Sequence, residues 1–400
     1  MRNNHHYQQP RTKNQEPATN NQELTTNKEA FVVQFRGAQP DGCASFFGAG
    51  VEKADSCYLC RAMGNHLTVT DFLSDATRVL FDVRSPGEFA QGHIPGALSF
   101  PLFSDEERAR VGTVYKQKGK EQAMELGLEL VGPKMAGFVQ KAKALAPGKR
   151  LAVHCWRGGQ RSQSMAWLFR QAGFDVVTLE SGYKAYRQHI LDNFGSWPLH
   201  IYIVGGRTGT GKTKFLHALR QLGEQILDLE QLAHHKGSAF GFIGETPQPT
   251  VEQFENDLFD AICRIDPAHR VWIENESRSI GRVFIPEPFW KKMKAATLLN
   301  IVIPEEARIT NLLNDYVLTD KTELESAFMK IDRKLGGQHL KAALEALQQG
   351  DYATAARIAL RYYDKTYQHC LDTNPSPDIR ELLFDHGDPE KIARFLIASV

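Results

Sequence analysis

Two loops of the kind that bind anions lie roughly 50 residues apart, and they constrain the fold more than any other feature. Residues 155–162 read Cys-Trp-Arg-Gly-Gly-Gln-Arg-Ser, and residues 206–213 match the phosphate-binding pattern G-x-x-x-x-G-K-[ST]. Each loop follows a short apolar segment and precedes a helical pattern, so its backbone N–H groups can converge at a helix N-terminus. The sequence therefore predicts two strand–loop–helix units.

Apolar segments alternate with helical patterns along most of the chain, and this order implies parallel sheets. Strands are predicted at residues 79–83, 151–154, 176–179, 201–204, 271–273 and 298–303. Helices are predicted at residues 121–130 and 137–146. After about residue 305 the chain turns helical, most clearly over residues 330–349 and 352–370. The predicted fold class is α/β, with a helical C-terminal region.

Shifts in composition divide the chain into four parts. Residues 1–62 are predicted to be a disordered or atypical extension, because the first 30 residues are rich in Asn, Gln and Thr. We hypothesise that the functional protein begins at or near Met63. The other predicted parts are residues 63–196, 197–305 and 306–400, with Trp197-Pro198 at the first boundary.

Charge and hydropathy exclude several classes of protein. No apolar run approaches the ~20 residues of a membrane helix, and the N-terminus lacks the apolar core of a signal peptide. A cytoplasmic enzyme without membrane contact is therefore expected. The formal net charge of +1 gives no bulk signal for nucleic-acid binding, so any polyanion has to be held by local patches.

Six cysteines in 400 residues do not form a recognisable disulfide framework. Cys57 and Cys60 form a lone C-x-x-C, but a structural zinc site needs four ligands at a recognisable spacing, so no metal site is predicted. Cys263 and Cys370 lie in helical patterns and are predicted to be core residues.

Cys155 is the predicted nucleophile, because a thiolate is favoured where backbone N–H groups and arginines surround the sulfur. Residues 82–89 and 92–97 resemble the signature of rhodanese-like domains, which carry sulfur or selenium on such a cysteine. The loop also resembles that of phosphatases built on this fold, so sulfur transfer and phosphate-ester hydrolysis both stay open. Asp82 and Glu88 are predicted to have structural roles. The other predicted loop residues are Arg157, Gly158, Gly159, Gln160 and Arg161.

The second loop predicts a P-loop NTPase-like α/β domain after the rhodanese-like one. Gly206, Gly209 and Gly211 let backbone amides wrap phosphate oxygens. Lys212 would reach the outer phosphates, and Thr213 could hold Mg²⁺, which is a candidate ligand. Glu274 and Glu276 follow the strand at 271–273 and could orient a metal or a water. The motif leaves open whether ATP is cleaved or a diphosphate group is only held.

Further segments join the two loops into one pattern: residues 111–119, 126–127, 180–187, 228–230, 234–241 and 274–281. Together they resemble the tRNA 2-selenouridine synthase family, over roughly residues 67–398 and with the same domain order. Ser181 stands where the family more often has Gly, and Asn275 where it often has Asp.

The resemblance implies an enzyme that replaces the sulfur of wobble 2-thiouridine in tRNA with selenium from selenophosphate. It implies an S-geranyl-2-thiouridine intermediate made from geranyl diphosphate, and no tightly bound cofactor. Cys155, Arg161 and Gly127 are the residues it assigns to the selenium step, with residues 157–160 as the selenophosphate loop. Diphosphate would bind at the P-loop. The implied partners are thiolated tRNA and a selenophosphate-producing enzyme.

Contacts to tRNA would come from local charge, and the wobble base would stack on Tyr183 or Trp156. Two other functions are alternatives. One is a rhodanese-type sulfurtransferase or rhodanese-fold phosphatase fused to a nucleotide-dependent kinase, and the other is a nucleotide-gated binding protein with a silent rhodanese part. The candidate tRNA-binding residues are Lys184, Arg187, Arg278, Arg333 and Lys334.

Overall fold

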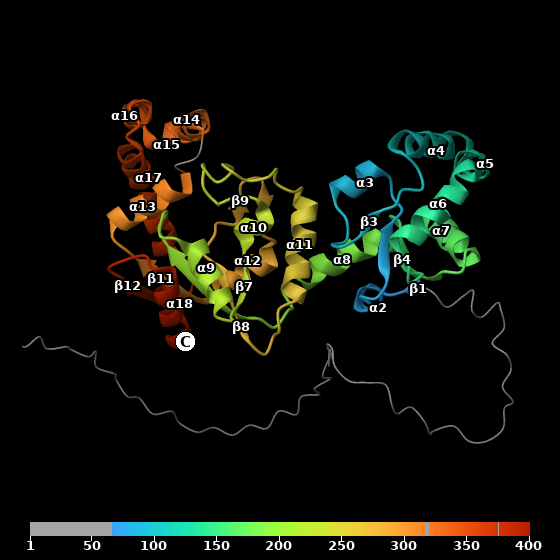
Figure 1. Ribbon diagram of the computed structural model, residues 1–400, viewed down its shortest axis with the longest axis horizontal. Helices are drawn as coiled ribbons and strands as arrows, with labels where there is room; N and C mark the ends of the chain where they lie inside the picture. The colour runs from blue at the N-terminus through green and yellow to red at the C-terminus, as the bar shows by residue number, and fades with distance from the viewer. Residues whose placement is uncertain (1–65, 317–319, 375) are drawn as a thin grey trace, which may run out of the picture. The chain divides into compact units, whose positions relative to one another are not determined.

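The computed structural model describes residues 66–316, 320–374 and 376–400 (Figure 1). The predictions for residues 1–62, the start at Met63 and the C-x-x-C of Cys57 and Cys60 fall outside these residues. The described part contains two five-stranded parallel sheets and a small antiparallel pair. The predicted α/β class, with a rhodanese-like domain followed by a P-loop domain, is confirmed.

The first sheet has the strand order β1-β5-β4-β2-β3, and all its strands are parallel. Phe81 of β2 lies opposite Val153 of β4. In this strand order both β2 and β4 have a neighbouring strand on each side. The strands predicted at 79–83, 151–154 and 176–179 are all present. The five strands are β1 (His66–Leu67), β2 (Val79–Asp82), β3 (Leu98–Ser99), β4 (Arg150–His154) and β5 (Asp175–Leu179).

Helices cover both faces of this sheet, because the side chains of each strand alternate between two apolar clusters. Leu151 and Val153 of β4 pack on α6 (Met135–Leu145) and α7 (Gln160–Gln171), whereas Ala152 faces α2 (Val69–Ser74) and α8 (Gly182–Asn193). Four further helical elements complete this domain. The first, α3, lies between β2 and β3, and the other three lie between β3 and α6. These are α3 (Pro86–Gln91), α4 (Asp105–Lys118), α5 (Lys120–Val131) and the short η1 (Gly132–Lys134).

The second sheet has the strand order β12-β11-β6-β8-β7 and is also parallel. Its edge strand β12 comes from the C-terminal region and pairs with β11 from Leu298 to Val302. The sequence predicted only helices after residue 305, so this strand is an addition to the prediction. The strands are β6 (His200–Gly206), β7 (Gln225–Leu227), β8 (Arg270–Glu274), β11 (Thr297–Val302) and β12 (Ile379–Leu383).

Two helical layers enclose the second sheet. Trp272 and Val204 pack on one side against α9 (Lys212–Gln221) and α18 (Pro389–Ala398). Val271 and Ile273 pack on the other side with α11 (Val251–Cys263) and α12 (Glu287–Lys294). The remaining elements are the helix α10 (Leu229–Ala233) and the antiparallel pair β9 (Ser279–Ile280) and β10 (Val283–Phe284).

Helices in the C-terminal region share an apolar core of their own. The single helical run predicted over residues 330–349 is wrong. Gly336 has a φ of 88°, a left-handed value that ends one helix and starts the next at Gly337. The helices are α13 (Glu305–Tyr316), α14 (Lys321–Met329), α15 (Asp332–Leu335), α16 (Gly337–Gln348) and α17 (Tyr352–Asp372). Within the residues that the structure describes, no helix is both long and apolar enough to span a bilayer.

One ion pair is fully buried at the end of β2. Arg84 Nη2 lies 2.6 Å from Asp82 Oδ2 and donates a second hydrogen bond of 2.6 Å to the carbonyl of Gly92. The guanidinium carbon also lies 3.8 Å from the ring centroid of Tyr183 in α8. The predicted structural role of Asp82 therefore has a specific geometry, since its carboxylate neutralises a buried cation.

Replacing Asp82 with Ala leaves the Arg84 charge buried without its counter-ion. We expect Asp82→Ala to lower the free energy of unfolding by about 3–5 kcal/mol. Urea denaturation of the full chain measures this loss. Glu390→Ala is the control, because its pair with Arg394 is exposed, so its effect is small. Equal effects of the two substitutions would contradict the assigned role of the buried pair.

Candidate functional site

Cys155 lies at the point where β4 ends, and its loop leads into α7. The side chain is buried, and its Sγ lies 3.2 Å from the hydroxyl of Ser162 in the first turn of α7. Gly158 has a φ of 64°, so the loop turns back on itself between strand and helix. The sulfur thus lies where a parallel sheet presents its functional groups, beyond the carboxyl ends of the strands.

The start of α8 closes this loop. Tyr183 N donates to the carbonyl of Cys155 at 2.8 Å, and Lys184 N donates to that of Trp156 at 3.0 Å. A Cβ on Gly182 would lie 2.4 Å from the Cys155 carbonyl oxygen, so glycine is required there. Ser181 before it has a φ of 54°, a conformation that favours glycine. This explains why glycine was expected at Ser181.

Arg161, predicted to act at the loop, is held by an ion pair. Its Nη1 lies 2.6 Å from Oε2 of Glu88 in α3. Burial alone would raise the pKa of Glu88, but the hydrogen bond and charge of Arg161 hold that pKa below its ordinary value. This ion pair is what the predicted structural role of Glu88 requires, and that role stays a prediction. Arg157 is the exposed arginine of the loop.

Gly127 lies in α5, outside the cysteine loop. It is buried, and a Cβ placed on it would meet the ring of Phe103 at 3.6 Å, an ordinary contact. Space therefore does not demand glycine at this position, and its role in the selenium step stays a prediction.

The P-loop connects β6 to α9, as its pattern predicts. Gly209 and Gly211 have φ values of 81° and 96°. A Cβ on Gly209 would lie 2.8 Å from the carbonyl oxygen of Arg308 in α13, so the loop is packed closely against that helix. These glycines allow backbone amides to face a phosphate while the chain stays against its support.

Three distant side chains, which no sequence motif predicts, brace the P-loop. Arg308 Nε donates to the carbonyl of Thr208 at 2.9 Å, and Asn311 Nδ2 donates to that of Gly209 at 3.0 Å. Gly206 N donates to the hydroxyl of Tyr367 at 2.8 Å. All three come from α13 and α17, about 100 to 160 residues farther along the chain. No local pattern marks such contacts.

Known proteins resemble the chain along both domains. A family model described as the tRNA 2-selenouridine synthase AAA domain matches residues 199–398, and a rhodanese-like domain model matches residues 68–189. Proteins named tRNA 2-selenouridine synthase from Bdellovibrio bacteriovorus and Shewanella denitrificans are each 36% identical to it. The first comparison covers 73% of this chain and 89% of the relative, and the second covers 74% and 88%. The chain belongs to the tRNA 2-selenouridine synthase family.

In this member of the synthase family, three carboxylates surround the P-loop lysine and threonine. Lys212 Nζ lies 3.9 Å from Glu276 Oε1, and the hydroxyl of Thr213 donates to Glu230 at 2.8 Å. Glu274 accepts from the backbone N–H of Glu230 at 2.8 Å. Both predicted acids, Glu274 and Glu276, thus lie at the phosphate site. Glu230 joins them from the first turn of α10.

Burial changes the proton affinities of this group. Desolvation raises the pKa of Glu276 to about 8, although the charge of Lys212 opposes the shift. Desolvation, with Asp228 and Glu230 nearby, also raises the pKa of Glu274 well above its ordinary value. Burial would lower the pKa of Lys212, but Glu276 and Glu230 outweigh it and raise that pKa. The lysine therefore stays charged, and the buried carboxyls of Glu274 and Glu276 bind protons more tightly than exposed ones.

A large basin opens at the P-loop, and cations and aromatic rings line it together. Lys212, Arg278 and Lys334 are among the cations, and Trp290 and Tyr362 are among the aromatic residues. Two of the five predicted tRNA-binding residues, Arg278 and Lys334, are therefore brought to one site. Lys184 is exposed on α8, and Arg333 is exposed on α15.

Arg187, the fifth predicted tRNA-binding residue, faces protein. It pairs with Glu255 and donates to Asn256 Oδ1 at 2.6 Å, both residues of α11. The same helix accepts a 2.8 Å hydrogen bond from the Tyr183 hydroxyl at Glu252. Arg187 and Tyr183 thus connect the rhodanese-like domain to the P-loop domain. The charge of Arg187 is neutralised within the protein.

The core prediction for the other cysteines is only half right. Cys263 at the end of α11 is half-buried, and burial raises the pKa of its thiol to about 12. Cys370, however, is exposed on α17 and lines the P-loop basin. Both cysteines lie in helices, as predicted, but the face of α17 that carries Cys370 is exposed.

The raised pKa of Glu276 makes folding stability depend on pH. Unfolded Glu loses its proton near pH ~4.3, so between there and about pH 8 the native state binds more protons. Stability therefore falls as pH rises through this range. Glu276→Gln removes the titrating group, and we expect a shallower fall, the rest coming from Glu274.

Urea denaturation at a series of pH values measures the slope. Glu381→Gln is the matched control, since Glu381 is exposed on the edge strand β12. Parallel stability curves for wild type and Glu276→Gln would contradict the assigned proton affinity.

Proposed function

We propose that this protein converts wobble 2-thiouridine of tRNA into 2-selenouridine in two steps, with geranyl diphosphate and selenophosphate as co-substrates. The observation that carries the proposal is the presence of both anion loops, each fully formed, in one chain of the synthase family. The P-loop serves a step that releases diphosphate, and the Cys155 loop serves a step that consumes a phosphate-linked selenium.

In the first step the thiouridine sulfur attacks C1 of geranyl diphosphate. A C–S bond forms, the C–O bond breaks, and diphosphate leaves with the electron pair, while N3 of the base gives up its proton to the diphosphate or water. Lys212 and the amides of Gly209 and Gly211 support this step, because a charged lysine and converging N–H groups stabilise the departing negative charge. Alkylation makes sulfur a better leaving group for the next step.

Mg²⁺ fits the same site as a ligand of diphosphate. Thr213 and Glu230 offer adjacent oxygen donors. Mg²⁺ commonly takes one or two protein oxygens and completes its shell with phosphate oxygens and water. In the described ranges, no three His, Cys, Asp or Glu side chains converge as a metal-holding group, so the ion would depend on the phosphate oxygens.

In the second step the selenium of selenophosphate attacks C2 of the geranylated base. A C–Se bond forms, the C–S bond breaks, and geranyl thiol leaves after taking up a proton. Water then cleaves the P–Se bond, phosphate departs, and selenium keeps the electron pair. Arg157 and the amides of residues 158–160 would hold the phosphate, with Cys155 at the reacting selenium. This route needs no oxidant, whereas a perselenide on Cys155 would.

The tRNA would be bound by the cations of the P-loop basin. Arg278, Lys330 and Lys334 line it beside Trp290 and Tyr362. Cations position RNA through its phosphates, and aromatic rings stack on an unpaired base. This mixture suits an anticodon loop whose wobble base is turned outward. A selenophosphate-producing enzyme would supply the donor for the other loop.

Mass spectrometry of nucleosides from thiolated tRNA tests the two steps separately. With both co-substrates, the wild type should yield 2-selenouridine. Cys155→Ala should stop at S-geranyl-2-thiouridine, and Lys212→Ala should leave thiouridine, with a loss of at least ~100-fold in geranylation. Cys263→Ala is the matched control and should behave as wild type, since its thiol is held in the neutral form.

Unchanged thiouridine with folded wild-type protein would overturn the proposal. Turnover of thiosulfate with cyanide, or of a simple phosphate ester, would then favour the sulfurtransferase or phosphatase alternative.

A further inference from the structure

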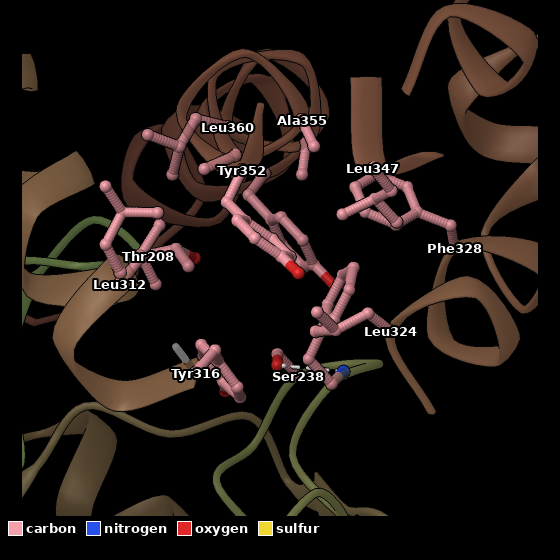
Figure 2. Close-up of a pocket in the computed structure, with 15 residues that line it drawn as sticks. Thr208, Ser238, Leu312, Tyr316, Leu324, Phe328, Leu347, Tyr352, Ala355 and Leu360 are labelled. Carbon is pink, nitrogen blue, oxygen red and sulfur yellow. Dashed lines mark hydrogen bonds between the residues drawn. The ribbon is translucent and has the colours of Figure 1, made fainter. Parts of the chain in front are cut away.

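An apolar cavity lies beside the P-loop, among the helices of the C-terminal region (Figure 2). Its volume is about 80 Å³, and its lining is almost entirely apolar. Its lining includes Leu312 of α13, Leu324 and Phe328 of α14, Leu347 of α16 and Leu360 of α17. An apolar lining of this kind offers few partners to water, so it favours a hydrocarbon occupant.

The cavity adjoins the phosphate-binding basin. Thr208 of the P-loop lines both, and so do Ser238, Leu312, Tyr316 and Tyr363. Thr208 is the third residue of the loop, whose later amides and Lys212 face the anion. A single ligand can therefore place a charged head at Lys212 and an apolar chain among the leucines.

The polar groups at the shared rim are already occupied. The Tyr363 hydroxyl accepts a hydrogen bond from Ala239 N at 3.1 Å, and Arg308 donates to the Thr208 carbonyl at 2.9 Å. Burial raises the pKa of Tyr316 and of Tyr363, so both phenols stay neutral. The rim thus adds no charge that would oppose an apolar chain.

We propose that this cavity binds the hydrocarbon chain of the diphosphate ester whose head group is bound by the P-loop. The inference rests on the proposed function and deepens it, because it assigns the chain to named residues and predicts what limits its length. Figure 2 shows Thr208 and Leu312 on one side of the cavity and Leu347 and Phe328 on the other. The chain enters beside Thr208 and ends near Leu347.

Small residues of α17 create the room for the chain. Ala355, Ala356 and Ala359 all line the cavity, where larger side chains would fill it. Ala355 lies near Leu347 in Figure 2, away from Thr208. A phenyl ring at position 355 should therefore block the far end of the cavity while the P-loop and the entrance stay free.

Calorimetric titration with inorganic pyrophosphate, dimethylallyl diphosphate and geranyl diphosphate tests this assignment. For wild type, affinity should rise with chain length by up to about fourfold per buried methylene. Ala355→Phe should bind pyrophosphate and dimethylallyl diphosphate within about twofold of wild type, but geranyl diphosphate about 10- to 100-fold more weakly. Lys212→Ala should weaken all three ligands, because it removes a contact to the head group.

Arg361→Phe is the matched control, since it adds the same ring at an exposed position of α17 outside the cavity lining. If Ala355→Phe does not fold, Leu347→Ala is the second variant. It lengthens the cavity and should improve the affinity for farnesyl diphosphate relative to geranyl diphosphate. Unchanged chain-length preference in the folded variants would overturn the assignment.

The two proposals fail in different ways. Length-dependent binding that Ala355→Phe abolishes, without any geranyl transfer to tRNA, would keep the cavity assignment and reject the proposed reaction. Geranyl transfer by wild type with an unaltered preference in Ala355→Phe would keep the reaction and reject the cavity.

Discussion

The burial of one guanidinium group organises the cysteine half of this protein. Removing a charge from water costs several kcal/mol unless polar or charged partners surround it. The guanidinium of Arg84 has such partners. Asp82 and the Gly92 carbonyl accept its hydrogen bonds, and the ring of Tyr183 lies against its carbon. The end of β2, the turn after α3 and the first turn of α8 must all be in place to satisfy one cation. These three segments support the Cys155 loop.

Tyr183 extends the same constraint into the P-loop domain. Its backbone N–H holds the Cys155 carbonyl, and its hydroxyl donates to Glu252 and accepts from Asn256 in α11. A residue that the sequence offered as a stacking partner for the wobble base is therefore fully buried as a structural link. Helix α11 therefore contributes, through Tyr183, to the support of the cysteine loop. The geometry thus connects the cysteine loop to the P-loop domain through packed side chains.

Local patterns predicted what local physics decides. The strands around 151–154 and 201–204 and the loops after them followed from apolar runs and glycines, because these encode backbone geometry within a few residues. The bracing of the P-loop by Arg308, Asn311 and Tyr367 did not follow, since those contacts join segments about 100 to 160 residues apart. The partner of Arg187 was hidden for the same reason. The sequence around a charged residue does not show whether its side chain contacts tRNA or another helix of the same protein.

The phosphate site combines two environments that water normally keeps apart. Lys212 stays charged beside Glu276, whose pKa burial raises to about 8, so an arriving diphosphate meets the lysine charge and converging amides. Beside them, Leu312 and Tyr316 line both the basin and the apolar cavity, whose side chains offer a phosphate no charge to bind. A nucleotide would satisfy the first environment and leave the second unfilled. A diphosphate with a hydrocarbon chain satisfies both, and this complementarity favours transfer of the chain over hydrolysis of a nucleotide at the P-loop.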